Sequence, residues 1–518
     1  MATACADARN PLDLNLYSVA QIRDIERNAL ASVPPGILMR RAGSATAELA
    51  LQLLHAASPT PRVLVVAGPG NNGGDALEAA AILAEQGVHV EVVRVANASR
   101  HTVEAAQALE RATDSAACFT GLEVLDAAST TGFNLAIDGL FGIGLARAPD
   151  GDFQRAIEGM NRLHCPVLSI DVPSGLDADS GARVGQTAVN ASHTITFLGN
   201  KPGLHTCEGR DHAGQVCVDT LQTDTSLYGA PLATLNHIGL FSANAVRRRH
   251  ASHKGSYGDL TVIGGAAGMG GAVLLASRMG AMAGAGRVFA AFAGKVPAFD
   301  PVHPELMCRD AHAAALDHGA AVIGPGLGLS RDANDLLDKA LACRLPLVID
   351  ADALNLLAEE SPLRHKLVAR TAATILTPHP LEAARLLGTD ATHVQADRTG
   401  AALELARRYR AVVILKGSGS IIAVPDGRIV INGTGNPALA TAGSGDVLSG
   451  LCGALLAQRW PAWEAALAAA WLHGAAADDM VAAGIGPVGV TAGELLPYIR
   501  SALNRLVTEV AGSRPASA

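Results

Sequence analysis

The sequence predicts an α/β protein with two domains, each built on a mostly parallel sheet that helices cover on both faces. Three observations lead to this prediction. Short apolar, β-branched runs alternate with helical patterns along the whole chain, which is typical of parallel sheets. The runs end in glycine-rich or acidic turns. The chain has 518 residues, of which 49% are hydrophobic and 17% charged, so more than one buried core can form.

The first half begins its pattern with the apolar run 63–66. This run ends in a turn of four glycines, a proline, two asparagines and Asp75, and an Ala/Leu-rich helical stretch follows to about Glu85. Further strands are predicted at 88–95, 135–137 and 167–170, with helices between them. Short β-branched runs that alternate with helical patterns indicate a parallel sheet covered on both faces.

The second half repeats the pattern, with strands predicted at 260–263, 321–323, 347–349, 374–376 and 412–415. Residues 220–250 lack it and contain Gly229, Pro231 and a basic cluster, so we expect an irregular connection there. The predicted domains are residues 1–225 and 226–518.

Charge and composition exclude several classes of function. The 40 basic and 48 acidic residues give a net charge of −8, so we expect neither nucleic acid nor an anionic membrane as a partner. The start of the chain has no apolar leader, and no run of 18 uncharged apolar residues occurs. The eight cysteines form no CxxC pair. A cytoplasmic protein is the resulting expectation.

Gly68, Gly70 and Gly73 fit the pattern G-x-G-x-x-G between a strand and a helix. Such a turn closes on an anion, because the following helix directs N–H groups at it. The acidic residue of classical dinucleotide sites is absent from the end of the second strand, which closes near Arg94. We therefore expect a nucleotide-type site without classical dehydrogenase binding.

Asp138 and Asp171 follow two further predicted strands. The carboxyl ends of parallel strands meet in one crevice, so these carboxylates, Asn72 and Ser174 are expected to converge there. The alternative is that each aspartate only caps a helix or closes a turn. Convergence of several polar strand ends favours a site.

The strings GPGNNGGD, IDGLFGIG and SIDVPSGLD resemble the N-terminal domain of the NAD(P)HX epimerase family over residues 15–225. The resemblance implies a Rossmann-like three-layer fold, with Asp171 as the catalytic acid/base carboxylate. It implies a potassium ion held by Asn72, Asp138 and Ser174, an oxygen donor set that suits a hard cation. It also implies substrate contacts from Asn71, Asn72, Gly73, Gly74, Asp75, Gly142, Ile143, Gly144, Leu145, Ala146, Arg147, Ala148 and Asp171. Ala76 departs from the glycine common in the family.

The string Gly443-Ser444-Gly445-Asp446 precedes a predicted helix at 447–457. Its backbone N–H groups form an anion site, and Asp446 is placed to take a proton from a substrate hydroxyl during phosphoryl transfer. This layout is typical of ribokinase-like folds. The alternative is a simple helix cap by Asp446. The turn Lys416–Ser420 lacks the P-loop order, and we expect its amides to meet nucleotide phosphates. His379, between two prolines, is either a substrate contact or a turn residue.

These strings, with GPGLG and DADALN, resemble the ADP-dependent NAD(P)HX dehydratase domain of the same bifunctional family over residues 240–510. The resemblance implies a ribokinase-like α/β domain. Substrate contacts are implied for Ala272, Gly328, His379 and Asp446, with Asp446 as the catalytic base. ADP contacts are implied for Lys416, Gly417, Ser418, Gly419, Ser420 and Gly445. Departures from the family pattern are Leu381, Ala438, Leu439 and Ala442.

The expected function is therefore repair of hydrated nicotinamide nucleotides. One domain would interconvert R- and S-NADHX or NADPHX, and the other would dehydrate the S form at the expense of ADP, with magnesium on the nucleotide and AMP and phosphate as products. The resemblance, and not the residues alone, selects ADP over ATP, and it implies a homo-oligomer. The alternatives are a ribokinase-type small-molecule kinase and a ligand-sensing scaffold, although the intact Asp171 and Asp446 disfavour the scaffold.

Overall fold

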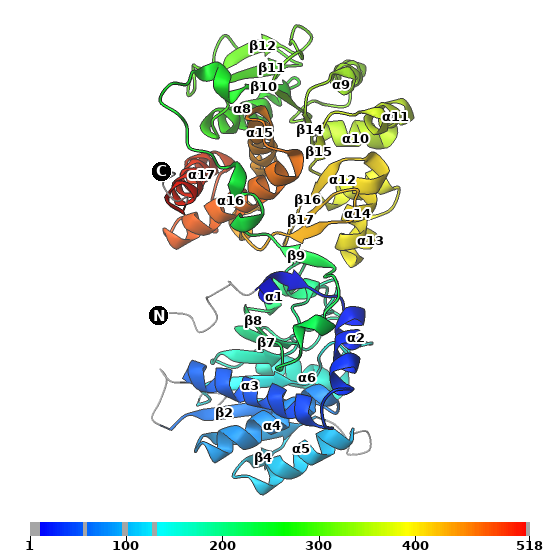
Figure 1. Ribbon diagram of the computed structural model, residues 1–518, viewed down its shortest axis with the longest axis vertical. Coiled ribbons are helices and arrows are strands. Elements are labelled where there is room, and N and C mark those ends of the chain that lie inside the picture. Colours follow the sequence, from blue (N-terminus) through cyan, green and yellow to red (C-terminus); the bar gives the residue numbers. More distant parts are fainter. Residues whose placement is uncertain (1–10, 55–59, 96–101, 127–131, 514–518) are drawn as a thin grey trace. The chain divides into compact units, whose positions relative to one another are not determined.

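The computed structural model describes residues 11–54, 60–95, 102–126 and 132–513, so the first ten residues of the start considered above lie outside it. The chain divides into two compact units, Met1–Thr234 and Leu235–Ala518. Each unit is an α/β layer structure around its own sheet, which confirms the predicted fold class (Figure 1). Among the described residues, no helix is both long enough and apolar enough to cross a bilayer.

The first unit holds a sheet with the strand order β4-β3-β2-β5-β6-β7-β8, in which the strands pair in parallel. Its strands are β2 (Arg62–Ala67), β3 (His89–Arg94), β4 (Cys118–Thr120), β5 (Leu135–Gly139), β6 (Val167–Ile170), β7 (His193–Phe197) and β8 (Gln215–Asp219). The short strand β1 (Asn15–Leu16) pairs antiparallel with the start of β9 (Ala233–Leu235).

The helices of this unit are α1 (Pro11–Leu14), α2 (Val19–Leu30), α3 (Ile37–Leu54), α4 (Asn71–Glu85), α5 (Val103–Asp114), α6 (Gly151–Met160) and α7 (Gly209–His212), with 3-10 turns at Leu122–Leu125, Pro202–Leu204 and Thr225–Leu227. Alternate residues of β2 face opposite layers. Val63 and Val65 pack in the core that α2 to α5 cover, and Leu64 and Val66 pack in the core with α6. The result is the predicted three-layer arrangement.

The second unit holds strands in the order β18-β17-β16-β15-β14-β13-β10-β11-β12. The strands are β10 (Asp259–Gly264), β11 (Arg287–Phe292), β12 (Met307–Asp310), β13 (Ala320–Ile323), β14 (Leu347–Ile349), β15 (Thr374–Leu376), β16 (Val412–Leu415), β17 (Ile421–Ala423) and β18 (Ile429–Ile431). All pairings from β12 to β16 are parallel, and β17 and β18 add antiparallel hairpins.

Its helices are α8 (Gly270–Met282), α9 (Arg331–Ala342), α10 (Asp352–Glu359), α11 (Ser361–Ala369), α12 (Pro380–Leu387), α13 (Ala391–Ala396), α14 (Arg398–Tyr409), α15 (Ser444–Ala457), α16 (Ala462–Ala482) and α17 (Ala492–Ser513), with 3-10 turns at Ile238–Leu240, Ser242–Asn244, Lys254–Tyr257 and Pro437–Leu439. Helices α8, α15, α16 and α17 share one core with the sheet, while Figure 1 shows α9 to α14 across the sheet from them.

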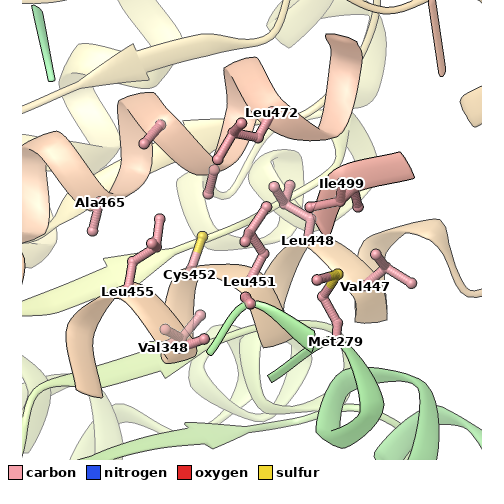
Figure 2. Packing of buried hydrophobic residues seen from close by; sticks show 14 of the residues in the cluster. Met279, Val348, Val447, Leu448, Leu451, Cys452, Leu455, Ala465, Leu472 and Ile499 are labelled. Carbon is pink, nitrogen blue, oxygen red and sulfur yellow. The ribbon is translucent and has the colours of Figure 1, made fainter. Parts of the chain in front are cut away.

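Helix α15 is the central helix of that core, because every residue from Val447 to Ala457 is buried. Figure 2 shows Leu451 and Leu455 of α15 between Val348 of β14 and Leu472 of α16. A helix that is apolar all round must be enclosed by protein. Its N-terminus is thereby held rigidly at the carboxyl edge of the sheet.

Candidate functional site

Each unit places a polar site at the carboxyl edge of its parallel strands. In the first unit this site is a cavity of about 550 Å³. Its walls come from α2, α3, the start of α4, and the segments after β5, β6 and β7. The predicted site residues in its lining are Asn71, Asn72, Asp75, Gly142, Ile143, Gly144, Leu145 and Asp171. The other five predicted contact residues, Gly73, Gly74, Ala146, Arg147 and Ala148, lie outside that lining.

The glycine turn brings the backbone of β2 against the segment after β5. A Cβ atom on Gly68 would collide with the backbone of Leu140, and one on Gly73 would collide with the backbone of Gly68. Only glycine permits this close packing. Helix α4 then begins at Asn71 with Gly70 as its N-cap, and no side chain caps its first N–H groups. Those donors remain for a ligand in the cavity.

Asp171 follows β6 with a left-handed backbone, φ 67°, which a non-glycine residue seldom adopts. Its Oδ2 accepts the N–H of Ile143 at 2.9 Å, and its Oδ1 accepts Nζ of Lys201 at 2.7 Å. The carboxylate is 14% exposed and Lys201 is 0% exposed. Backbone strain at a cavity residue that other contacts hold in place is a mark of a functional position.

Lys201 is a site residue that the sequence analysis did not single out. Its Nζ also donates to Oγ1 of Thr196 at 2.6 Å and to the carbonyl of Phe197 at 2.8 Å. All three ammonium protons therefore have acceptors. The signal for it in the sequence is a lysine shortly after the β-branched and aromatic stretch 194–198, which is strand β7 and was not among the predicted strands.

Asp138 lies inside β5 and not after it, because the strand extends two residues beyond its predicted end. Its Oδ1 accepts Oγ of Ser174 at 2.6 Å, and its Oδ2 accepts Oγ of Ser169 at 2.8 Å. Burial raises the pKa of Asp138, and the hydrogen bonds from Ser174, Ser169 and Leu140 offset only part of this effect. Asn72 is nearby, since a Cβ on Gly139 would approach its carbonyl oxygen at 3.1 Å.

In the second unit, the predicted anion site is the turn before α15. Gly443 is the N-cap, with φ 88°, and Asp446 lies in the first turn of the helix. Asp446 makes no capping hydrogen bond, so the capping alternative is wrong. Burial and the charge of Asp350 raise its pKa to about 6, against the opposing effect of Lys416. Asp446 therefore titrates near the neutral range, as a general base must.

Lys416 joins the predicted ADP turn to two acidic residues. Its Nζ lies 2.9 Å from Oδ1 of Asp350 and 3.8 Å from Oε2 of Glu382. A Cβ on Gly445 would lie 3.3 Å from the same Nζ, so the turn before α15 meets this group. Burial by itself lowers the pKa of Lys416, but the two carboxylates more than offset it and the pKa is raised. Asp350 and Glu382 were not among the predicted site residues.

His379 has a structural role that the sequence left open. It is the N-cap of α12, and its Nδ1 accepts the N–H groups of Leu381 and Glu382. Its Nε2 lies 3.2 Å from Oε1 of Glu382. Burial and the charge of Lys416 lower the pKa of His379, while burial raises that of Glu382 to about 7. His379 thus belongs to the same cluster as Lys416.

Gly328 lies in the loop after β13, and Ala272 lies in the first turn of α8 at the same edge. The N–H of Gly328 donates to Oδ2 of Asp352 at 2.8 Å, and a Cβ on Gly326 would lie 3.3 Å from that of Ala272. Asp352 also contributes to the raised pKa of Asp446. The structure thereby brings the predicted substrate residues of this unit to one edge of the sheet.

A buried arginine stabilises the turn 416–420 by hydrogen bonds to carbonyl groups in and beside it. Arg398 is 2% exposed, and its Nη2 donates to the carbonyls of Leu415, Lys416 and Gly419 at 3.4–3.5 Å. Gly417 adopts φ 135° beside that guanidinium, where a Cβ would lie 2.9 Å from Nη1. Sequence reasoning missed Arg398, because its partners are carbonyls some twenty residues away.

The family departures are divided between packed and exposed positions. Ala76 and Ala438 are buried, and Leu439 packs beside Gly435. Leu381, which follows His379 by two residues, is 47% exposed, and Ala442 is exposed as well.

Two family models match the chain. Residues 35–203 match the model described as YjeF-related protein N-terminus, and residues 260–500 match the model described as NAD(P)H-hydrate dehydratase. The chain is 39% identical to a bifunctional NAD(P)H-hydrate repair enzyme of Coxiella burnetii, over 94% of this chain and 99% of the relative. It is 37% identical to the enzyme of the same description from Escherichia coli, over 91% and 90% of the two chains.

Two further relatives match one half of the chain. An ADP-dependent (S)-NAD(P)H-hydrate dehydratase of Neisseria meningitidis is 47% identical, over 50% of this chain and 89% of the relative. The crystal structure of an ADP/ATP-dependent NAD(P)H-hydrate dehydratase from Bacillus subtilis is 32% identical, over 52% and 98% of the two chains, with a TM-score of 0.48.

Proposed function

The chain belongs to the family of bifunctional NAD(P)H-hydrate repair enzymes, and from this premise we propose how its two units divide the work. The protein interconverts the R and S epimers of hydrated NADH or NADPH. It dehydrates the S epimer to NAD(P)H at the expense of ADP, giving AMP and phosphate. We assign epimerisation to residues 1–225 and dehydration to residues 226–518.

One observation carries this assignment. Each unit holds a partly buried carboxylate at the carboxyl edge of its sheet, beside a buried lysine that is ion-paired. In the first unit Asp171 is itself paired with Lys201. In the second, Asp446 faces the pair formed by Asp350 and Lys416. Two separate acid/base centres are what two consecutive reactions require.

In the first unit, Asp171 acts as the acid/base group. Its two hydrogen bonds, from Lys201 and from the N–H of Ile143, fix the carboxylate toward the cavity. The predicted contacts in the lining would hold the substrate, while the exposed amides at the start of α4 would meet its phosphates.

Potassium fits the oxygen donors around Asp138. The carboxylate is fully buried, and the ion pairs of the described residues include none to it. The buried Nδ2 of Asn72 has no hydrogen-bond partner among those residues, so rotating the side-chain amide to present Oδ1 to the ion would break no hydrogen bond of Nδ2. We propose that Asn72, Asp138 and Ser174 would hold the ion. Bound there, it would supply a positive charge that compensates Asp138 and orders the segment after β5.

In the second unit, the S-NAD(P)HX hydroxyl gives its proton to Asp446 as its oxygen attacks the terminal phosphoryl group of ADP, which releases AMP. The N–H groups at Gly443–Gly445 and the Nζ of Lys416 stabilise the charge on the transferring group. The phosphate ester then leaves as phosphate, with the ring-nitrogen lone pair as the driving electrons, and loss of a ring proton restores the dihydronicotinamide. Phosphate is a far better leaving group than hydroxide.

Magnesium is proposed to accompany ADP. The described residues contain no cluster of three metal-ligating side chains, so the nucleotide phosphates would supply most of its ligands. Glu382 and Asp350 have carboxylates beside Lys416, and these are the protein groups that fit a hard cation there. Bound magnesium would neutralise developing phosphate charge. We also propose a homo-oligomer in the cytoplasm.

The dehydratase half is tested with purified S-NADHX, magnesium and either ADP or ATP. NADH absorbance should return with ADP, and AMP and phosphate should form in equal amounts. If ADP is consumed without NADH, or only with an alcohol such as a vitamin or sugar, the chain is instead a ribokinase-type kinase.

A further inference from the structure

The epimerase cavity is lined by four acidic side chains, and among the described residues Lys201 is the buried cation beside them. Glu26, Asp75, Glu104 and Asp171 all line it, and of these four only Asp171 is hydrogen-bonded to Lys201. The resemblance accounts for Asp171 and Asp75, whereas Glu26 has no role in the account above. Burial of an acidic side chain without a partner is unfavourable, because it disfavours the charged form, so an unpaired acid in such a cavity suggests a function.

Glu26 lies in the middle of α2, whose N-terminus is fixed by a capping box between Ser18 and Gln21. The helix turns Ile22, Arg23, Glu26 and Leu30 toward the cavity, at the spacing of one helix face. Among the described residues, the carboxyl group of Glu26 has neither a hydrogen-bond nor an ion-pair partner. It is half-buried, so solvent can still reach it.

Asp171 and Glu26 are therefore placed in opposite electrostatic situations within one cavity. Asp171 accepts hydrogen bonds from two donors, the N–H of Ile143 and Nζ of Lys201. Burial raises the pKa of Glu26, and the charge of Asp171 raises it further against the smaller effects of Lys201 and Arg23. One carboxyl group held by a cation and a second one without a partner suit the roles of base and acid.

We propose that Glu26 is a second catalytic residue of this cavity, the acid that works with Asp171 as the base. The inference rests on the epimerase function proposed above. An epimerase that acts on both stereoisomers must deliver and remove a proton on the two faces of one ring. A second acid/base group on a separate wall of the cavity meets that need, and α2 supplies it.

The step balances without a co-reactant other than water. Glu26 gives its proton to the hydroxyl on the ring carbon bonded to nitrogen, the C–O bond breaks with its electrons going to oxygen, and water leaves. The nitrogen lone pair forms the C=N bond. Water then adds to the other face of that carbon, the C=N electrons return to nitrogen, and Asp171 takes the excess proton. The reverse reaction exchanges the two roles.

Asp75 is the competing candidate for this proton. Burial raises its pKa well above the ordinary value, and Asp171 and Glu26 raise it further. It is the less accessible of the two, so Glu26 is better placed to recover its proton from solvent after each turnover. The charged groups that face Glu26 are Arg23 on its own helix, Asp75 on α4, Glu104 on α5, and Asp171 with Lys201 beyond β6.

The experiment uses the full-length protein with pure R-NADHX and no ADP, so that the dehydratase is idle, and follows the two epimers by chromatography. Glu26→Gln should lower kcat at least about 100-fold with little change in KM. Glu26→Asp should recover part of the rate. The matched control is Asp24→Asn on the same helix, an exposed residue paired with Arg27, which should leave the rate unchanged.

Stability separates catalysis from a structural role. The folded-state pKa of Glu26 is raised, so ionisation costs the fold stability as the pH rises through the range between the unfolded and folded values. At pH 8, Glu26→Gln should therefore melt no lower than the wild type. Its S-NADHX dehydration with ADP should also be unchanged, which shows an intact chain.

Two results would overturn the proposal. One is an undiminished epimerisation rate in Glu26→Gln, and the other is an effect confined to KM. If the undiminished rate is accompanied by loss of activity in Asp75→Asn, the role moves to Asp75. If the wild-type protein itself leaves R-NADHX unchanged while S-NADHX is dehydrated, the proposed epimerase function fails first, and the role of Glu26 fails with it.

Discussion

The fully buried Nζ of Lys201 donates a 2.7 Å hydrogen bond to Oδ1 of Asp171, thirty residues earlier in the chain. The contact joins the ends of two adjacent parallel strands, β6 and β7. It fixes the carboxylate of a residue whose own backbone is strained, and it supplies the only described ion pair of that carboxylate. In the proposed epimerase site, Asp171 is therefore held as part of an ion pair and not as an isolated carboxylate.

Removing Lys201 should damage both the fold and the epimerase. Lys201→Met leaves Asp171 partly buried without its cation, so the free energy of unfolding should fall by about 3 kcal/mol. R-NADHX conversion should be lost while S-NADHX dehydration persists. Urea denaturation and the two assays measure these effects. The double variant with Asp171→Asn should regain stability without activity, and full epimerase activity in Lys201→Met would contradict the pairing.

The dehydratase should depend on pH through Asp446. A base must be deprotonated, and the pKa of Asp446 is raised to about 6. The rate with saturating S-NADHX and ADP should fall as the pH drops through 6 and level off above it. Asp446→Asn should lower kcat by about 10² to 10⁴ and abolish this dependence. An unchanged pH profile in the variant would assign the base to another residue, with Glu382 as the next candidate.

Arg398 should determine how well the turn 416–420 binds ADP. Its guanidinium holds the carbonyls of Leu415, Lys416 and Gly419, so Arg398→Met should loosen the turn. We expect KM for ADP to rise about tenfold, equivalent to about 1.4 kcal/mol, with a smaller change in KM for S-NADHX. Arg407→Met, at an exposed position of the same helix, is the control. Equal changes in both KM values would indicate general unfolding instead.

Potassium should activate the epimerase through the buried donors around Asp138. Exchange of potassium for choline should slow the conversion of R- to S-NADHX measured without ADP, because Asp138 then has no compensating charge. Asn72→Leu should be slow in both buffers and insensitive to the exchange. A wild-type rate that is equal in both buffers would exclude the proposed ion.

The strand ends could be predicted from local sequence, because each strand is a short apolar run closed by polar or glycine residues. Strands β6, β14, β15 and β16 have the predicted bounds, and the ends of the other five predicted strands, β2, β3, β5, β10 and β13, differ by one or two residues. The sequence pattern did not predict strands β4, β7, β8, β11, β12, β17 and β18. Asp446 and the turn before it follow from the same local pattern. The roles implied for these residues stay predictions, since geometry places them without testing chemistry.

The partners of those residues could not be predicted, because they come from distant segments. Lys201 follows β7, which the sequence pattern did not predict, and Glu26 lies on a helix whose face toward the cavity depends on the packing of the whole unit. Asp350 belongs to the string DADALN, which gives no sign of its partner, because its contact with Lys416 bridges 66 residues. Burial and neighbouring charge, which set the pKa values, exist only in the folded chain.

Conversion of pure R-NADHX to NADH by the full-length protein with ADP and magnesium tests the central claim most directly, because it requires both units in sequence. The account predicts that NADH absorbance rises to completion with one AMP per NADH. In the Asp171→Asn variant, NADH absorbance from R-NADHX should rise only at the rate of spontaneous epimerisation, while S-NADHX still reacts at the wild-type rate. If the wild type yields no NADH from either epimer, or if Asp171→Asn converts R-NADHX as fast as the wild type, the account is contradicted.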